Sequence, residues 1–190
     1  MYVVTLMTHG EQILRNAVLM RHAEPLVEPN RPPAEWHLSS QGRSFSYELA
    51  TCLNAIGLRR IVTSPEAKAA ETAAVVADVL GVSVIVDDRL REVRRPWTGS
   101  HFESAVASYL TGERHEGWEP IRAVVSRLQD SLVNHTGAGP VGLVTHGTAM
   151  ACLLDSLCLV EPAKFWSELT MPDAWTFDGE RILRLYLTDT

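Results

Sequence analysis

The sequence is poor in cysteine, carries no excess of basic charge and contains no long apolar run, and each absence excludes a class of protein. The cysteines are odd in number and match no zinc-ligand spacing: Cys52, Cys152 and Cys158. This argues against both a disulfide framework and a structural zinc site. Because each cysteine lies in an apolar stretch, we expect buried free thiols in a reducing compartment.

Charge and hydropathy also limit the partners. With 17 basic against 23 acidic residues the formal net charge is -6, whereas binding nucleic acid requires clustered Lys and Arg in excess. No apolar run approaches the roughly 20 residues that span a bilayer, and "MYVVTLMTHGEQILRN" lacks the basic n-region of a secretory signal. We therefore expect a cytoplasmic protein that binds neither nucleic acid nor membrane, and nothing selects an oligomeric state. A small phosphorylated ligand needs only a few cations placed together.

Strand and helix patterns alternate along the chain, and we interpret residues 1–190 as one domain. Short apolar runs predict buried strands at "NAVLM", "RIVT", "VSVIVDD" and "GPVGLVTHG", and "AWTFDGERILRLYL" predicts a hairpin that turns at "DG". The expected fold is a three-layer α/β/α architecture with a mostly parallel central sheet and an antiparallel edge from this C-terminal hairpin. Residues 1–15 are either an extension or an extra strand.

Helices are predicted between these strands from apolar periodicity and from capping residues. Ser39 or Ser40 is available as N-cap of the first helix and Gly57 as its stop; in the second, Ser64 is expected as N-cap, with Pro65 at the first helical position and Gly81 as the stop. The remaining expected helices are "FESAVASYL", the stretch from Trp118 to Leu132, "TAMACLLDSL" and "EPAKFWSEL".

A polar residue follows each of several predicted strands. Arg21 and His22 follow "NAVLM", Ser64 and then Lys68 follow "RIVT", and His146 follows "GLVT". Ligands of open parallel sheets bind beyond the carboxyl ends of the strands, so these residues are expected to meet, together with Glu92 after the third strand.

This set of residues suits phosphoryl transfer. A phosphoryl group needs several convergent donors, which Arg21, Lys68 and His146 can supply. Neutral imidazole attacks phosphorus, and neighbouring cations would lower the pKa of His22 and keep it neutral. Glu92 would protonate the departing oxygen and then take a proton from the water that splits phosphohistidine.

The ordered segments "VLMRHAEP", "LSSQGR", "VTSPEAKAAETA", "LREV" and "GLVTHG" resemble the histidine phosphatase superfamily (phosphoglycerate mutase-like) from about Ala17 to Leu154. The resemblance implies that His22 is the phosphohistidine nucleophile, with Arg21 beside it. It implies that His146 is the second pocket histidine and Glu92 the acid. No metal and no cofactor are expected.

Three residues depart from the family pattern. Ala23 replaces the usual glycine, Lys68 stands at the second arginine of the pattern "SPLxRAxxTA", and Glu28 stands where many members have asparagine. Lysine keeps the charge without bidentate geometry, and a carboxylate at position 28 would repel phosphate unless it points away.

The hexapeptide "LMTHGE" resembles "LMRHAE", which raises the question of which histidine acts. His9 has Thr8 where His22 has Arg21, so we predict that His22 is the nucleophile. We expect Arg94, Arg95 and Trp97 to contact the non-phosphate part of a substrate.

The leading functional hypothesis is a phosphomonoesterase acting on a small phosphorylated substrate through phosphohistidine. The short segment between Glu92 and Trp118 favours hydrolysis over a closed mutase pocket. A phosphoglycerate-mutase-type phosphotransferase and a phosphate-ligand or phosphoprotein binding module without turnover are the alternatives. A metallohydrolase using His22 and His146 is disfavoured, because the clustered carboxylate spacing of such sites is missing from the sequence.

Overall fold

The computed structural model describes residues 14–96, 99–137 and 139–186. The sheet in this part of the chain has six strands in the order β3-β2-β4-β1-β5-β6. The strands are β1 (Ala17–Arg21), β2 (Arg60–Thr63), β3 (Ser83–Val86), β4 (Val141–Thr145), β5 (Asp173–Phe177) and β6 (Ile182–Tyr186). Strands β3, β2, β4 and β1 are parallel to one another, whereas β5 is antiparallel to both β1 and β6. The predicted mixed sheet with an antiparallel edge is confirmed.

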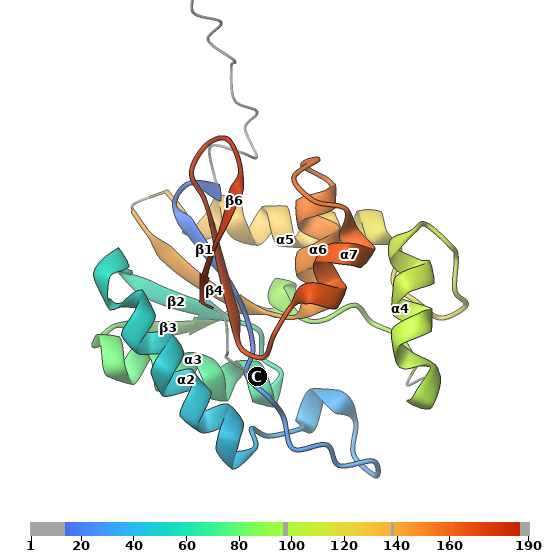
Figure 1. Ribbon diagram of the computed structural model, residues 1–190, viewed down its shortest axis with the longest axis horizontal. Coiled ribbons are helices and arrows are strands. Elements are labelled where there is room, and N and C mark those ends of the chain that lie inside the picture. Colours follow the sequence, from blue (N-terminus) through green and yellow to red (C-terminus); the bar gives the residue numbers. More distant parts are fainter. Residues whose placement is uncertain (1–13, 97–98, 138, 187–190) are drawn as a thin grey trace, which may run out of the picture.

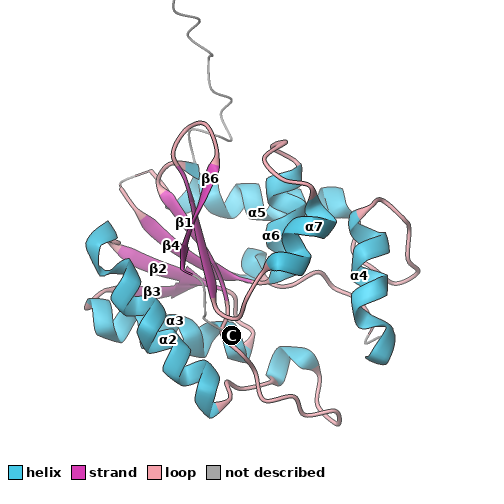
Figure 2. Cartoon of the chain, in the orientation of Figure 1, coloured by secondary structure: helices cyan, strands magenta, loops and turns pink. Residues whose placement is uncertain are grey.

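Helices cover both faces of this sheet (Figures 1 and 2). They are α2 (Ser40–Leu53), α3 (Ala67–Leu80), α4 (Phe102–Leu110), α5 (Ile121–His135), α6 (Gly147–Asp155) and α7 (Pro162–Glu168). Short 3₁₀ turns are η1 (Pro33–Glu35), η2 (Asn54–Ile56), η3 (Asp88–Leu90) and η4 (Gly99–His101). No helix in the described ranges is both long and apolar enough to cross a bilayer.

The alternation of side chains along each strand builds two separate cores. In β1, Leu19 packs with α5 and α6, while Val18 and Met20 pack on the opposite face with α2 and α3. In the central strand β4 a Cβ at Gly142 would lie 2.5 Å from Met20 Cε and 2.7 Å from Ile61 Cδ1, so the ends of these two buried side chains would have to shift for any other residue. This two-sided burial explains why the central strands are short continuous apolar runs.

Most predicted element boundaries are confirmed, and two are wrong. Ser39 caps α2 by accepting a hydrogen bond from Gly42 N, and Gly57 and Gly81 are left-handed stops. However, α3 begins at Ala67 with Glu66 at the N-cap position, not after Ser64. The Ser64 amide instead donates to Val144 O, and the Ser64 hydroxyl accepts from the Glu66 amide, so Ser64 and Pro65 lie in the connection between β2 and α3 and not in the helix.

The second error concerns α5, which begins at Ile121 and excludes Trp118. Pro120 precedes it, and the residue before a proline is disfavoured in helical conformation. The expectation of buried thiols holds only for Cys152, because Cys52 and Cys158 are exposed, although all three are free. His9 and most of the N-terminal stretch, as well as Trp97, lie outside the described residues, so the predictions about them stay open.

Candidate phosphoryl-transfer site

The carboxyl ends of three parallel strands place the predicted residues at one edge of the sheet. Arg21 pairs in register with Thr145, so the residues that follow, His22 and His146, are neighbours. The His22 amide donates to Thr145 O, and the two imidazole ring centres are 5.0 Å apart. Ser64, after β2, reaches the same edge. Residues separated by more than a hundred positions are therefore joined by strand pairing alone.

A cleft of about 920 Å³ opens over this edge. The five residues singled out in the sequence all line it: Arg21, His22, Lys68, Glu92 and His146. We call Arg21, His22 and His146 the floor of the cleft, and we include Ser64, which is fully buried and contacts His146. The segment Asp87–Arg95, together with Glu119 and Arg127, forms what we call its wall.

A backbone contact fixes which nitrogen of the His22 ring carries the hydrogen. Nδ1 lies 2.8 Å from the carbonyl oxygen of Ala23, which can only accept, so Nδ1 carries the hydrogen and Nε2 keeps its lone pair. Burial lowers the pKa of His22 well below 6.5, and His146, Lys68 and Arg21 lower it further. The ring is therefore neutral at pH 7, the state that a nucleophile requires.

The Arg21 guanidinium is buried at the floor with donors to spare. Its Nη1 donates to Leu169 O at 3.0 Å, but its Nε has no partner in the described part of the chain. Burial lowers the pKa of Arg21, which Glu92 and Asp173 oppose, and the group stays charged. A Cβ at Gly147 would lie 3.2 Å from Arg21 Nε, so a glycine at the start of α6 keeps the space beside the guanidinium open.

His146 occupies the N-cap position of α6 and is completely buried. Its Nε2 lies 2.9 Å from Ser64 Oγ, whereas its Nδ1 has no partner among the described residues. Burial lowers the pKa of His146 to about 4, although Glu66 and Glu92 raise it. Buried polar atoms normally have a hydrogen-bond partner, so Nδ1 marks a place that a ligand can fill.

The Glu92 carboxylate lies at the N-terminus of α6. Its Oε1 accepts from Ala149 N at 3.0 Å and from its neighbour Val93 N at 2.9 Å, and its Oε2 lies 3.3 Å from Thr148 N. Burial by itself would raise the pKa of Glu92, but Arg95, His146 and the Val93 amide outweigh it and hold the pKa below its ordinary value. Without a ligand Glu92 is therefore ionised, and it must gain a proton before it can act as an acid.

In the wall, the ion pair between Arg127 and Glu119 holds the segment that carries Glu92. Arg127 makes hydrogen bonds to both carboxylate oxygens of Glu119 and to the carbonyl oxygens of Arg89, Arg91 and Glu92. A guanidinium has five N–H donors, and five hydrogen bonds use them. Arg127 therefore has no donor left for a substrate and serves to shape the segment that carries Glu92.

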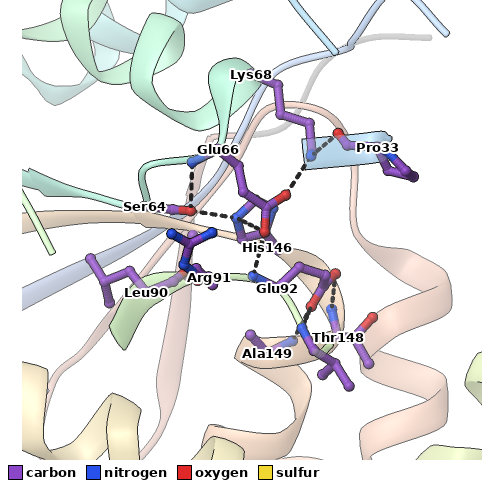
Figure 3. A network of polar contacts seen from close by, with 12 residues as sticks. Pro33, Ser64, Glu66, Lys68, Leu90, Arg91, Glu92, His146, Thr148 and Ala149 are labelled. Carbon is purple, nitrogen blue, oxygen red and sulfur yellow. Dashed lines mark hydrogen bonds and ion pairs between the residues drawn. The ribbon is translucent and has the colours of Figure 1, made fainter. Parts of the chain in front are cut away.

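Sequence reasoning missed Glu66, a buried carboxylate in the middle of this site (Figure 3). Its Oε2 accepts from Lys68 Nζ at 2.6 Å, and its Oε1 accepts from Glu92 N at 2.9 Å. Burial alone would raise the pKa of Glu66, yet His146, Lys68 and the Glu92 amide lower it to about 2. The available signal was a carboxylate at the leucine position of "SPLxRAxxTA".

The three departures from the family pattern have clear structural outcomes. Lys68 is buried and also donates to Pro33 O at 2.7 Å, so two of its three hydrogens are used and one is left for a ligand. Glu28 pairs with Arg31 at 3.6 Å and is not among the residues that line the cleft. Ala23 is fully buried, and its amide donates to Thr72 Oγ1.

Comparisons with known proteins identify the family to which this chain belongs. Residues 17–175 match the histidine phosphatase superfamily (branch 1). Over 162 residues the chain is 26% identical to a probable phosphoglycerate mutase GpmB of Yersinia enterocolitica, covering 76% of this chain and 75% of the relative.

Solved structures show the same fold at lower identity. A mycobacterial glucosyl-3-phosphoglycerate phosphatase superposes with a TM-score of 0.67 at 22% identity, covering 90% of this chain and 96% of the other. A phosphoserine phosphatase of Entamoeba histolytica, bound to phosphoserine, gives 0.63 at 17% identity, covering 91% and 96%. Since the family match extends over most of the sequence, the chain belongs to the histidine phosphatase superfamily.

Proposed function

We propose that the protein is a phosphomonoesterase that hydrolyses a small phosphorylated substrate through a phosphohistidine on His22. One observation carries the proposal. The neutral His22 ring, with its Nε2 lone pair available, lies beside two buried polar atoms that have no hydrogen-bond partner among the described residues: Arg21 Nε and His146 Nδ1. A phosphoryl group offers several oxygens, which matches donors converging on one attacking nitrogen.

In the first step the Nε2 lone pair of His22 attacks phosphorus, the N–P bond forms and the bond to the leaving oxygen breaks. Glu92 gives its proton to that oxygen. In the second step water attacks phosphorus, Glu92 accepts a proton from the water, and the N–P bond breaks to release phosphate and neutral imidazole. Arg21, His146 and the remaining hydrogen of Lys68 balance the charge on the equatorial oxygens.

The ionised state of Glu92 determines where its proton comes from. A phosphate monoester has a second pKa of about 6, so part of the substrate is monoanionic near neutral pH and carries the required proton into the cleft. Transfer of that proton to Glu92 leaves a protonated acid beside a dianionic phosphoryl group. Activity should therefore decline as pH rises above the second pKa of the substrate.

Arg95 supports a substrate with a second anionic group. It lines the cleft with its guanidinium carbon 4.6 Å from the Phe102 ring centre and 5.2 Å from the Trp118 ring centre. Its Nη1 is buried without a partner in the described ranges. The solved relatives are named for phosphoserine and glucosyl-3-phosphoglycerate, which both carry a carboxylate. Arg95→Gln should weaken turnover of 3-phosphoglycerate more than that of glycerol 3-phosphate; equal losses would remove this assignment.

The decisive experiment is hydrolysis of p-nitrophenyl phosphate in excess chelator, with acid-labile phosphoryl label followed in parallel. The wild-type protein should hydrolyse p-nitrophenyl phosphate and acquire the phosphoryl label, and His22→Ala should do neither. His37→Ala is the matched control, because His37 is exposed and pairs with Glu71 away from the cleft. Binding of vanadate without turnover or label on any phosphometabolite would replace catalysis with a binding function.

Phosphoryl exchange is the second candidate, favoured by the similarity to a probable phosphoglycerate mutase. A mutase returns the phosphoryl group to an organic acceptor, whereas a phosphatase gives it to water. Incubation with 3-phosphoglycerate therefore separates them: released phosphate supports hydrolysis, and appearance of 2-phosphoglycerate without phosphate supports exchange.

A further inference from the structure

Glu66 and Lys68 depart from the family pattern as a linked pair. The pattern "SPLxRAxxTA" has leucine and arginine at these two positions, and this chain has a carboxylate and an ammonium joined at 2.6 Å. Both side chains are buried. The family pattern has an apolar residue and a cation at these positions, so the carboxylate of Glu66 adds a negative charge to the site. A negative charge there opposes the binding of an anion unless another group compensates for it.

The Glu66 carboxylate faces the site instead of capping its helix. Glu66 is at the N-cap position of α3, where side chains often bind the first free amides, but it makes no such bond. Its Oε1 lies 3.5 Å from His146 Nε2 and accepts from the Glu92 amide (Figure 3). Glu66 thus contacts the second histidine and the segment that carries the acid.

The two nitrogens of His146 have different surroundings. Nε2 lies near two oxygens, Ser64 Oγ at 2.9 Å and Glu66 Oε1 at 3.5 Å, and a carboxylate on this side favours the tautomer with hydrogen on Nε2. Nδ1 is buried without a partner in the described part of the chain. In this tautomer Nδ1 is a bare lone pair, which would repel an oxyanion unless it gained a proton.

Charges of both signs act on His146 from the elements packed around it. Glu66 and Glu92 favour its protonation, while burial, Lys68 and Arg127 oppose it. In the unliganded site the opposing influences win, and the neutral His22 ring adds no charge. An oxyanion in the cleft would supply a further negative charge on the Nδ1 side, so His146 would lie between that anion and Glu66.

We propose that Glu66 is a positioning residue that supplies the counter-charge for His146, so that binding of an oxyanion is coupled to uptake of one proton on His146 Nδ1. The proton comes from solvent, Nε2–H stays directed toward Ser64 and Glu66, and the new Nδ1–H donates to the oxyanion. The inference rests on the proposed phosphoryl site but not on turnover. Glu66 is then the residue that makes the affinity for an oxyanion depend on pH.

Sulfate is the probe, because it is a tetrahedral dianion that does not titrate near pH 7. Calorimetry in buffers of different ionisation enthalpy measures the protons taken up per sulfate bound. Wild type should take up about one proton, and its affinity should fall about tenfold per pH unit above pH 7. Glu66→Gln, which keeps an acceptor for the Glu92 amide, should take up less than about half a proton and bind with a flatter pH profile.

Nitrogen-15 spectra of histidine-labelled protein identify the proton acceptor. The His146 signals, assigned by their loss in His146→Gln, should move to imidazolium values on adding sulfate to wild type and stay neutral in Glu66→Gln. Glu24→Gln is the matched control, since Glu24 also lines the cleft but bonds to Ser39 instead, and it should behave as wild type.

Several outcomes would overturn the inference. His146 could stay neutral in the wild-type sulfate complex, or become imidazolium equally in Glu66→Gln, or sulfate could fail to bind. A merely structural Glu66 would change affinity without changing the proton stoichiometry. Turnover of p-nitrophenyl phosphate is measured separately, so loss of the phosphatase proposal and loss of this one are distinguishable.

Discussion

The floor and the wall of the cleft are built from similar residues that are used in opposite ways. Both contain a half-buried arginine, but Arg21 on the floor leaves its Nε without a partner in the described ranges, while Arg127 in the wall uses every donor. Unused hydrogen-bonding capacity weakens the folded state and prepares a site for a ligand, whereas saturated capacity stabilises a segment. The comparison suggests that floor substitutions should reduce activity and wall substitutions should reduce stability.

The largest expected effect is on the floor. Arg21→Met should lower kcat/KM for p-nitrophenyl phosphate by roughly 10⁴-fold, because it removes the planar cation that stabilises the transferring phosphoryl group. Its free energy of unfolding should change by only about 1 kcal/mol, since one hydrogen bond, to Leu169 O, is lost and the desolvation cost of the cation disappears together with its attraction to Glu92 and Asp173. Urea denaturation checks the second value, and a large loss of stability would contradict the assignment of Arg21 to function.

The matching substitution in the wall is Arg127→Met. It leaves Glu119, whose side chain is 4% exposed, as an unpaired buried charge, and should cost about 3–5 kcal/mol of unfolding free energy. The double variant Arg127→Met/Glu119→Gln should recover part of this loss, because the orphaned charge is gone. If Arg127→Met unfolds at the same urea concentration as wild type, the ion pair between Arg127 and Glu119 does not stabilise the wall.

Acid should destabilise the protein through the floor histidines. The pKa of His146 is about 4 when folded, against 6.5 for an unperturbed histidine, so the unfolded state binds more protons between these values. The free energy of unfolding should therefore fall as pH drops from 6.5 toward 4, by on the order of 3 kcal/mol from His146 alone. His22, also depressed, adds to the effect. His146→Gln should flatten this part of the urea midpoint profile; an unchanged slope would show that other groups control it.

The smallest effect is expected for Ser64, a floor residue that contacts His146 and not the proposed phosphoryl group. Ser64→Ala removes the hydroxyl that contacts His146 Nε2 and accepts from the Glu66 amide. Unfolding free energy should fall by about 1 kcal/mol, and kcat/KM by no more than about tenfold, because Glu66 still faces the ring. A loss as large as that of Arg21→Met would mean that Ser64 contacts the reacting group itself.

Much of the fold could be predicted because its signals are local. The apolar runs, the glycine stops after α2 and α3 and the "DG" turn each lie within one short segment. The start of α3 could not be predicted this way, because the Ser64 amide is bound to Val144, eighty residues away in the sequence. Pairing with a distant strand holds the chain against β4 at Ser64, so the helix begins three residues later, although the Ser64 hydroxyl still accepts from the Glu66 amide.

The candidate site also contains residues that the sequence predicts and residues that it does not. Arg21, His22 and His146 were predictable because parallel strands bring their carboxyl ends together and each is followed by a polar residue. Glu66 was not, because its contacts with Glu92 and His146 depend on loops that meet only in the folded chain. The ionised state of Glu92 was also unpredictable, since it depends on the amides of α6 and on the nearby guanidinium of Arg95.

The sequence by itself determined the alternating architecture, the family and the residues that gather at the sheet edge. Tertiary structure decided which of their atoms are buried, which are already bonded and which are left for a ligand. The physical reason is that periodicity and backbone preference are properties of neighbours along the chain. Desolvation and hydrogen-bond occupancy depend on groups brought together from distant segments.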